Sequence, residues 1–282
     1  MEITGDVEVV IDRALAEDLG LGDPTTEILV PRDLEGEAVL VARESGVLAG
    51  IDVGLAVFRR VDGQLRATGL LDDGAAVEAG TRLATVQGRV ASILKAERTV
   101  VNFIQHLSGI ATETRRYVDA VEGHGARIVD TRKTTPGLRQ LEKQAVRAGG
   151  GVNHRQNLGD GILIKDNHIE AAADQGMSIG DAVRKTMREA PHTIRVEVEV
   201  EDLDQLEQVL DAGAEIVLLD NMDVELMARA VDMCRGRAVT EASGGITLAT
   251  VKDVAATGID IISVGALTHS VKALDVSLDM AR

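Results

Sequence analysis

The chain has 282 residues, of which 45% are hydrophobic and 27% charged, and its formal net charge is −16. This length and composition predict a folded chain with one large domain or two smaller ones, and they exclude a disordered or low-complexity protein. The acid excess fits either a salt-rich cytoplasm or an ordinary solvated surface, and it argues against general binding to nucleic acid, which requires a cationic surface.

The N-terminal sequence and the cysteine content indicate a cytoplasmic location. The opening stretch, MEITGDVEVV, lacks the basic and then apolar signature of a signal peptide. No apolar run approaches the roughly 18 residues that a membrane-spanning helix needs. The single cysteine, Cys234, cannot form an internal disulfide and fits a reducing compartment. We therefore expect a cytoplasmic protein that does not enter a membrane.

The first hundred residues predict a small domain of helix and antiparallel strands. Residues 1–20 carry an apolar face at helical spacing and predict a helix. Residues 37–88 contain short apolar stretches broken by glycine turns, a pattern typical of antiparallel strands. A long helix follows over residues 91–116, with a break expected near Ser108 and Gly109.

From Ala126 onward the chain repeats a strand and then a helix. The apolar runs are ARIVDTRK, GILIKDN, TIRVEVEVE, AEIVLLDN, AVTEASGG and IDIISVGA, and a seventh strand could lie near GGVNHR. Strands separated by amphipathic helices indicate a parallel sheet, either a barrel with fewer than eight confident repeats or a doubly wound sheet. In both architectures the carboxyl ends of the strands carry the ligand site.

Positive side chains follow several of these strands. Residues 127–165 hold eight Lys or Arg residues against three acids, although the whole chain is acidic. Each cation alone could be a surface charge or part of a salt bridge. Several that converge at one edge of a sheet repel each other, so the pattern favours a ligand with more than one negative charge. The residues concerned are Arg132, Lys133, His154, Arg155, Lys165 and His168.

Acidic side chains form a second candidate cluster. In RVEVEVE, the period of two places Glu197, Glu199 and Glu201 on one face of a strand and the valines on the other. Asp220 ends the next strand. Such carboxylates can hold hydrated Mg²⁺, accept hydrogen bonds from sugar hydroxyls, or pair with the cations described above.

Two glycine-containing loops follow late strands. They are SGG, Ser243 to Gly245, and VGA, Val264 to Ala266. Glycine lets backbone amides approach a phosphate closely, and loops after the last strands of a barrel often bind one. Either loop alone could equally be a tight turn.

Several motifs together resemble one enzyme family. DTRKTTPGLRxLEKxAVRxGGG, NHRxxLxDxxLIKDNH, VEVEVE, LLDN, EASGGI and SVGALTHS occur in the order and spacing of quinolinate phosphoribosyltransferase, also called nicotinate-nucleotide pyrophosphorylase (carboxylating). The resemblance extends from EDLGLGDPTT to ALDVSLD. It implies a decarboxylating phosphoribosyltransferase of NAD biosynthesis, which converts quinolinate and phosphoribosyl pyrophosphate to nicotinate mononucleotide, pyrophosphate and CO₂ with Mg²⁺.

The resemblance also implies a fold and an assembly. The expected α/β fold combines an N-terminal α/β sandwich domain, residues 1–108, with an incomplete TIM-like α/β barrel, residues 109–269. Residues 270–282 are expected to pack back on the sandwich. The expected assembly is a homodimer, or a higher homo-oligomer, in which each active site receives residues from two subunits.

Carried over residue by residue, the resemblance implies a set of site residues. Arg132, His154, Arg155 and Lys165 match the positions that hold the quinolinate carboxylates, and Arg98 matches an arginine that the neighbouring subunit provides. Lys133 matches the lysine near the pyrophosphate, beside Thr131. Glu199 and Asp220 match the acids near the ribose hydroxyls and, indirectly, Mg²⁺. The expected phosphate loops are Ser243, Gly244 and Gly245, and Val264, Gly265 and Ala266; the expected catalytic residues are Lys133, Glu199 and Asp220.

Two alternatives stay open on the sequence. One is a paralogue of the same fold that uses another pyridine or an unrelated anion, as in a molybdenum-associated relative that shares DTRKTTPG. The other is a phosphate-binding barrel without catalytic activity, acting as a regulator or scaffold. The complete set of cations favours quinolinate over the first, and the acid pair beside the phosphate loops argues against the second.

Overall fold

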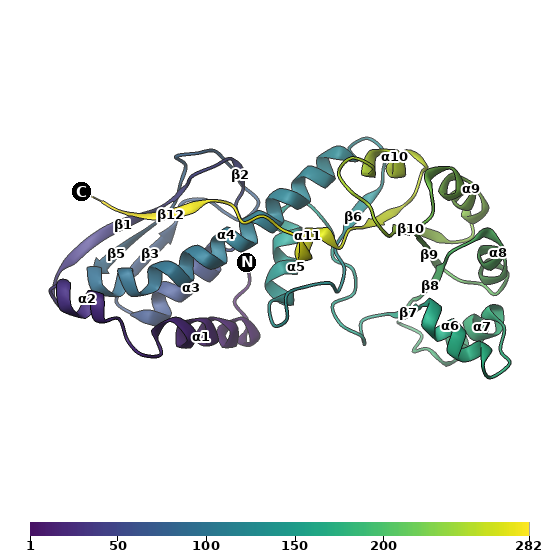
Figure 1. The fold of residues 1–282 in the computed structure, drawn as a ribbon, viewed down its shortest axis with the longest axis horizontal. Helices are drawn as coiled ribbons and strands as arrows, with labels where there is room; N and C mark the ends of the chain where they lie inside the picture. The colour runs from purple at the N-terminus through teal and green to yellow at the C-terminus, as the bar shows by residue number, and fades with distance from the viewer. Residues whose placement is uncertain (282) are drawn as a thin grey trace. The chain divides into compact units, whose positions relative to one another are not determined.

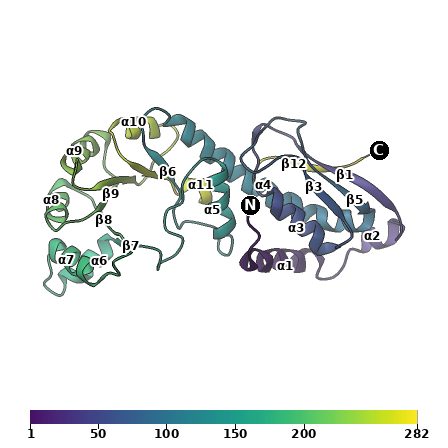
Figure 2. The ribbon, with the colours of Figure 1, turned by 180° about the vertical axis from the view of Figure 1, so that it is seen from behind.

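The computed structural model describes residues 1–281, which form two compact units. The first unit contains Met1–Arg115, Lys133–Gly150 and the chain from Ala266 onward, and the second contains Arg116–Arg132 and Gly151–Gly265. The elements of both units are labelled in Figure 1 and seen from behind in Figure 2. Within the described residues, no helix has both the length and the apolar character that crossing a bilayer requires.

The first unit is built on an antiparallel sheet, as predicted. The strand order is β12-β1-β5-β3, from β1 (Glu35–Ala42), β3 (Arg66–Gly69), β5 (Arg82–Arg89) and β12 (Val276–Met280), and β2 (Gly46–Val47) pairs with β4 (Ala76–Val77). The helices of this unit are α1 (Gly5–Leu19), α2 (Pro24–Leu29), α3 (Ile51–Val61), most of α4 (Val90–Ala120), α5 (Arg139–Ala148) and α11 (Ala266–His269). Strand β12 lies beside β1 although more than 200 residues separate them, and its ribbon is the yellow strand next to the purple one in Figure 1.

Helix α3 corrects the expectation of strands alone over residues 37–88. Its side chains Ile51, Leu55 and Phe58 are buried at helical spacing, and the helix packs on β3. Gly50, which we interpreted as one of the glycine turns between strands, has a φ of 87° and precedes the helix. A side chain at Gly54 would collide with Ile104 of α4, so this glycine allows close packing of the two helices.

The predicted break in the long helix is absent, because α4 runs without interruption through Ser108 and Gly109. Both residues serve packing instead. The Ser108 hydroxyl accepts a hydrogen bond from the Ala49 N–H at 2.9 Å, and Gly109 has no room for a side chain because the backbone of Lys272 and Ala273 lies against it.

The second unit is an incomplete α/β barrel, as predicted. Its six parallel strands have the order β6-β11-β10-β9-β8-β7. They are β6 (Arg127–Val129), β7 (Ile162–Ile164), β8 (Val196–Val200), β9 (Ile216–Asp220), β10 (Val239–Ser243) and β11 (Ile261–Ser263). In both views the helices lie outside the strands: α6 (Asp166–Ala173), α7 (Ile179–Glu189), α8 (Leu203–Asp211), α9 (Val224–Cys234) and α10 (Val251–Ala256).

The possible seventh strand is a single bridge. Val152, in the GGVNHR stretch, pairs with Val129 of β6 in parallel, and its N–H donates to the Ile128 carbonyl at 2.9 Å. Its position next to β6 extends the sheet beyond that strand. Residues 153–155, which carry predicted site residues, therefore start from this edge of the barrel.

Candidate active site

The parallel register brings predicted site residues of the second unit to the carboxyl edge of the sheet. Asp220 and Ser243 are partners at the ends of β9 and β10, and Glu199 lies near the end of β8, next to Leu218 of β9. Lys165 follows β7 directly, and Thr131 and Arg132 come shortly after β6. The strand ends thus place cations, acids and a hydroxyl on one edge, as the sequence predicted.

Lys165 and Glu199 form an ion pair, with Lys165 Nζ 2.7 Å from Glu199 Oε2. The Glu199 side chain is 9% exposed, whereas that of Lys165 is 45% exposed. Pairing between the cationic and acidic clusters was one of the interpretations of the sequence, and the structure shows it at this position. The half-exposed ammonium can also meet a ligand from the solvent side.

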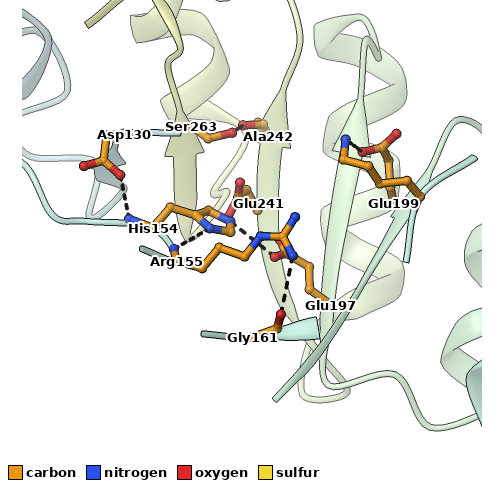
Figure 3. A network of polar contacts seen from close by, with 10 residues as sticks. Asp130, His154, Arg155, Gly161, Glu197, Glu199, Glu241, Ala242 and Ser263 are labelled. Atoms are coloured by element: carbon orange, nitrogen blue, oxygen red, sulfur yellow. Dashed lines mark hydrogen bonds and ion pairs between the residues drawn. The ribbon is translucent and has the colours of Figure 1, made fainter. Parts of the chain in front are cut away.

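His154 lies between two buried carboxylates, which Figure 3 shows around its ring. Its Nε2 is 3.3 Å from Glu197 Oε2 and 3.4 Å from Glu241 Oε2, and the acids are 8% and 3% exposed. Burial opposes a charge on the ring, but hydrogen bonds and attraction to both carboxylates outweigh it and raise the pKa of His154 to about 10. Burial also raises the pKa of Glu197. The cluster therefore retains a proton at neutral pH.

The place of that proton follows from a hydrogen bond. The Arg155 backbone N–H donates to His154 Nδ1 at 2.7 Å, so Nδ1 carries a lone pair in this geometry, whereas an imidazolium would need a hydrogen there. A neutral ring beside one protonated carboxyl group has the same number of protons and the same net charge as an imidazolium between two carboxylates. We assign the shared proton to the carboxyl pair, and the raised pKa values of His154 and Glu197 both express it.

The ligand types of this cluster would suit a transition metal, because His154, Glu197 and Glu241 offer atoms within 4.8 Å of one another. A neutral imidazole bound to a metal through Nε2 must carry its hydrogen on Nδ1. In the structure that nitrogen accepts the Arg155 N–H instead. The geometry thus fits a proton better than a metal ion.

Arg155 experiences repulsion from a second guanidinium. Burial lowers its pKa first and the positive charge of Arg132 lowers it further, while Glu197 acts in the opposite direction. The guanidinium also donates to the Gly161 carbonyl at 3.4 Å (Figure 3). Two partly buried guanidinium groups that repel each other would be stabilised by a bound anion.

A cavity of about 400 Å³ lies at the opposite, amino ends of the strands. Its wall includes residues at the starts of strands, such as Arg127, Ile216 and Ile261, together with the predicted site residues His154 and Arg155 and the acids Glu197 and Glu241. The Oε1 atoms of these two acids are buried and accept no hydrogen bond within the described residues.

The loop after β10 requires its glycines. Gly244 and Gly245 have φ values of 91° and 59°, and a side chain at Gly244 would collide with Asn221. Asn221 itself has a φ of 54°, the one positive value among the described residues other than glycine, and its N–H donates to the Ser243 carbonyl at 3.0 Å. In the second loop, Val264 is buried and its N–H donates to the Val129 carbonyl.

Three predicted site residues belong to the first unit. Arg98 is exposed on α4, and Ala266 is the first residue of α11. Lys133 is exposed and is the first residue of the segment Lys133–Gly150. The Lys133 carbonyl accepts a hydrogen bond from the Thr268 hydroxyl at 2.8 Å. The roles expected for these residues stay predictions.

The sequence reasoning missed residues that organise the site. Asp130 is fully buried at the end of β6, and Glu241 is buried in the middle of β10. Both signals were present, since each is a charged residue within or directly after an apolar strand, as Glu197 is. The strained Asn221 follows Asp220 in LLDN, where only its backbone conformation distinguishes it.

Fold and site together define a class of protein: an α/β-barrel enzyme for small, multiply anionic substrates. Two family models match the chain, "Quinolinate phosphoribosyl transferase, N-terminal domain" over residues 23–108 and the corresponding "C-terminal domain" over residues 110–279. The chain belongs to the quinolinate phosphoribosyltransferase family, which confirms the resemblance.

Relatives and solved structures agree with this assignment over nearly the whole chain. The nicotinate-nucleotide pyrophosphorylase [carboxylating] of Mycobacterium leprae is 48% identical over 276 residues, covering 96% of this chain and 95% of that protein. A probable enzyme of the same name from Bacillus subtilis is 42% identical over 271 residues, covering 96% of this chain and 92% of that protein. The solved structure of nicotinate-nucleotide pyrophosphorylase from Francisella tularensis superposes with a TM-score of 0.92 at 40% identity, covering 99% and 98% of the two chains. NadC from Streptococcus pyogenes gives a TM-score of 0.94 at 39% identity, covering 100% of both.

Proposed function

We propose that this chain is a decarboxylating quinolinate phosphoribosyltransferase, which forms nicotinate mononucleotide, pyrophosphate and CO₂ from quinolinate and phosphoribosyl pyrophosphate. The names of its relatives state this activity for those proteins. The observation that carries the proposal is the match of both family models to the chain, together with the two partly buried guanidinium groups of Arg132 and Arg155. A substrate with two adjacent carboxylates neutralises such a pair.

In this proposal three cations of the second unit hold quinolinate. Arg132 and Arg155 supply planar donors for carboxylates, and Lys165 supplies a point charge. His154 is still proposed to contribute to quinolinate binding, although its ring faces Glu197 and Glu241. Its proposed role is to position Arg155, because His154 Nδ1 accepts a hydrogen bond from the Arg155 backbone N–H. This fixes the site for a dianion before the substrate arrives.

The acids would act on the ribose. Departure of pyrophosphate gives the anomeric carbon positive character, and Glu199 and Asp220 on neighbouring strands can stabilise that charge and accept hydrogen bonds from ribose hydroxyls. Both are also proposed to hold Mg²⁺ indirectly, since carboxylates suit a hydrated Mg²⁺ ion. When bound, Mg²⁺ would neutralise the charge of the pyrophosphate. Lys133 is proposed to do the same from the protein side.

The substrate contributes the last step itself. Attack of the pyridine nitrogen on the anomeric carbon leaves that nitrogen with a positive charge. The charge stabilises the carbanion formed when the neighbouring carboxylate departs as CO₂, and a proton then replaces the carboxylate. The chain's part is to hold the ring so that nitrogen and anomeric carbon meet.

The glycine loops are proposed to bind the 5′-phosphate. Ser243 to Gly245 offer backbone N–H groups in a conformation that larger residues disfavour, as the positive φ values of both glycines indicate. Val264 to Ala266 are the second proposed loop, and Thr131 the proposed hydroxyl donor.

We also propose a homodimer, or a higher homo-oligomer, located in the cytoplasm. Support for a shared site is the exposed position of Arg98 on α4, where a second subunit can reach it. In the proposed assembly, Arg98 contacts quinolinate in the neighbouring subunit.

Product analysis tests the proposal. The protein is incubated with quinolinate, phosphoribosyl pyrophosphate and Mg²⁺, and nicotinate mononucleotide is followed by chromatography, with nicotinate replacing quinolinate as the control. We expect product from quinolinate and little from nicotinate, which lacks the second carboxylate. Product from nicotinate alone would indicate a paralogue with another pyridine substrate, and binding without turnover would indicate a regulatory barrel.

A further inference from the structure

A buried carboxylate joins the two segments that carry the paired guanidinium groups. Asp130 is fully buried at the end of β6. Its Oδ2 accepts a hydrogen bond from Asn153 Nδ2 at 2.6 Å, and its Oδ1 accepts one from the His154 backbone N–H at 2.9 Å. Figure 3 shows the contact with His154. Both carboxylate oxygens thus bind the segment that follows Val152.

The contact between Asp130 and Asn153 lies close to both arginines along the chain. Asp130 lies two residues before Arg132, and Asn153 lies two residues before Arg155. The Asp130 clamp, meaning the hydrogen bonds of Asp130 to Asn153 and His154, therefore lies two residues from each arginine along the chain. Burial and then the positive charge of Arg132 lower the pKa of Arg155, so charge repulsion acts between the two segments that the clamp joins.

The sheet contributes little to holding these segments. Val129 and Val152 pair as an isolated bridge, and residues 153–161 form no helix or strand. The bridge consists of two backbone hydrogen bonds, from the Val152 N–H to the Ile128 carbonyl at 2.9 Å and from the Asp130 N–H to the Val152 carbonyl at 3.2 Å. Beyond Val152, the Asp130 side chain continues the connection.

We propose that Asp130 is a positioning residue that sets the separation of Arg132 and Arg155 to match the two carboxylates of the substrate. This inference rests on the proposed function, because it takes quinolinate as the ligand of that pair. Asp130 touches no substrate in this account. It acts through Asn153 and the His154 backbone.

An aspartate is required at position 130 because both of its side-chain oxygens accept hydrogen bonds. An asparagine in place of Asp130 offers one acceptor and one donor, so its amide group would face the donor of either Asn153 or His154. Exchanging the two residues restores the match. In the double variant D130N/N153D, the new amide oxygen can accept the His154 N–H while the new amide nitrogen donates to the carboxylate that replaces Asn153, and the net charge is unchanged.

The test compares D130N, N153D and D130N/N153D by steady-state kinetics. Loss of a buried hydrogen bond to a carboxylate predicts a rise in KM for quinolinate of about tenfold in D130N, with a smaller change in KM for phosphoribosyl pyrophosphate. N153D places two carboxylates together and should be impaired as well. The double variant should recover to within about threefold of the wild type, since the exchange restores the match of donors and acceptors.

A matched control is D260N. Asp260 precedes β11 and accepts two hydrogen bonds from Thr240, from its N–H and its hydroxyl, each at 2.8 Å. This variant should lose thermal stability without a change in KM for quinolinate. N153A, which removes one donor and adds no charge, provides a second variant if N153D fails to fold, and it should raise the KM less than D130N does.

Hydrogen exchange tests the structural effect of the Asp130 clamp independently of the proposed function. D130N should speed amide exchange over residues 153–157 relative to D260N, whatever the substrate is. Unchanged exchange, or a D130N variant with the wild-type KM for quinolinate, would overturn the inference. Absence of turnover in the wild type would overturn the proposed function instead.

Discussion

The cluster of His154, Glu197 and Glu241 predicts a specific loss of stability in alkaline solution. The folded-state pKa of His154 is about 10, against an ordinary value of 6.5. A raised folded-state pKa contributes stability that is fully present below the unfolded pKa and disappears as the pH rises through the folded pKa. The contribution should therefore be complete below pH 6.5 and lost by about pH 10.

The size of the effect follows from the shift. One pKa unit corresponds to about 1.4 kcal/mol, so the difference between 6.5 and about 10 amounts to about 5 kcal/mol. Solvent screening is limited, because the His154 side chain is only 17% exposed and the acids less than that. Between the two pKa values, the free energy of unfolding should fall by about 1.4 kcal/mol per pH unit through this cluster.

Urea denaturation of the wild type and of E197Q/E241Q at pH 6.5, 8 and 9.5 measures this slope. The two amides cannot hold the proton that the carboxyl pair shares, so the difference in stability between the two proteins should shrink by about 1.4 kcal/mol per pH unit as the pH rises. E207Q/E225Q, which changes two exposed acids, is the matched control and should follow the wild type. Parallel pH dependence in the wild type and E197Q/E241Q would refute the assignment of a retained proton to this cluster.

The remaining predictions concern the reaction. Arg132→Ala and Lys165→Ala should each lower kcat/KM for quinolinate by about a hundredfold or more while circular dichroism stays unchanged, and kinetics like those of the wild type would contradict the carboxylate site. Glu199→Gln, which keeps the shape but removes the charge next to the proposed oxocarbenium, should lower kcat by about a hundredfold; an effect on KM alone would assign Glu199 to binding. Chelation with EDTA should stop turnover and added Mg²⁺ should restore it, whereas activity that resists chelation would exclude the proposed ion. Mixing inactive Arg98→Ala and Lys165→Ala subunits should restore about a quarter of the wild-type activity if sites are shared in a dimer, and no recovery after subunit exchange would indicate that each subunit uses its own arginine.

The barrel could be predicted from the sequence because its signals are local. Each parallel strand is a short apolar run with a helix after it, and this alternation is visible without knowledge of distant contacts. The N-terminal unit was harder, since Gly50 suggested a turn between strands, whereas it precedes a helix in which Gly54 allows close packing on α4. The pairing of β12 with β1 depends on contacts between opposite ends of the chain, and a local pattern does not contain it.

The site likewise has residues that local signals predict and contacts that depend on distant parts of the chain. The strand ends identified Lys165, Glu199 and Asp220, because the carboxyl edge of a parallel sheet is fixed by chain direction. Which cation meets which acid was not predictable: the ion pair of Lys165 with Glu199 depends on the adjacency of β7 and β8. The cluster around Glu241 could not be predicted from local sequence, because it joins elements that are not consecutive along the chain. His154 follows the bridge beside β6, Glu197 lies on β8 and Glu241 on β10.

The most direct test of the central claim follows the carboxylate that the reaction removes. Quinolinate carrying ¹³C in its 2-carboxylate is supplied with Mg²⁺, with and without phosphoribosyl pyrophosphate, and labelled CO₂ is measured together with nicotinate mononucleotide. The account predicts equal amounts of labelled CO₂ and nicotinate mononucleotide, and no labelled CO₂ when phosphoribosyl pyrophosphate is omitted. Formation of a phosphoribosylated pyridine that keeps the labelled carboxylate, or release of CO₂ without phosphoribosyl pyrophosphate, would contradict it.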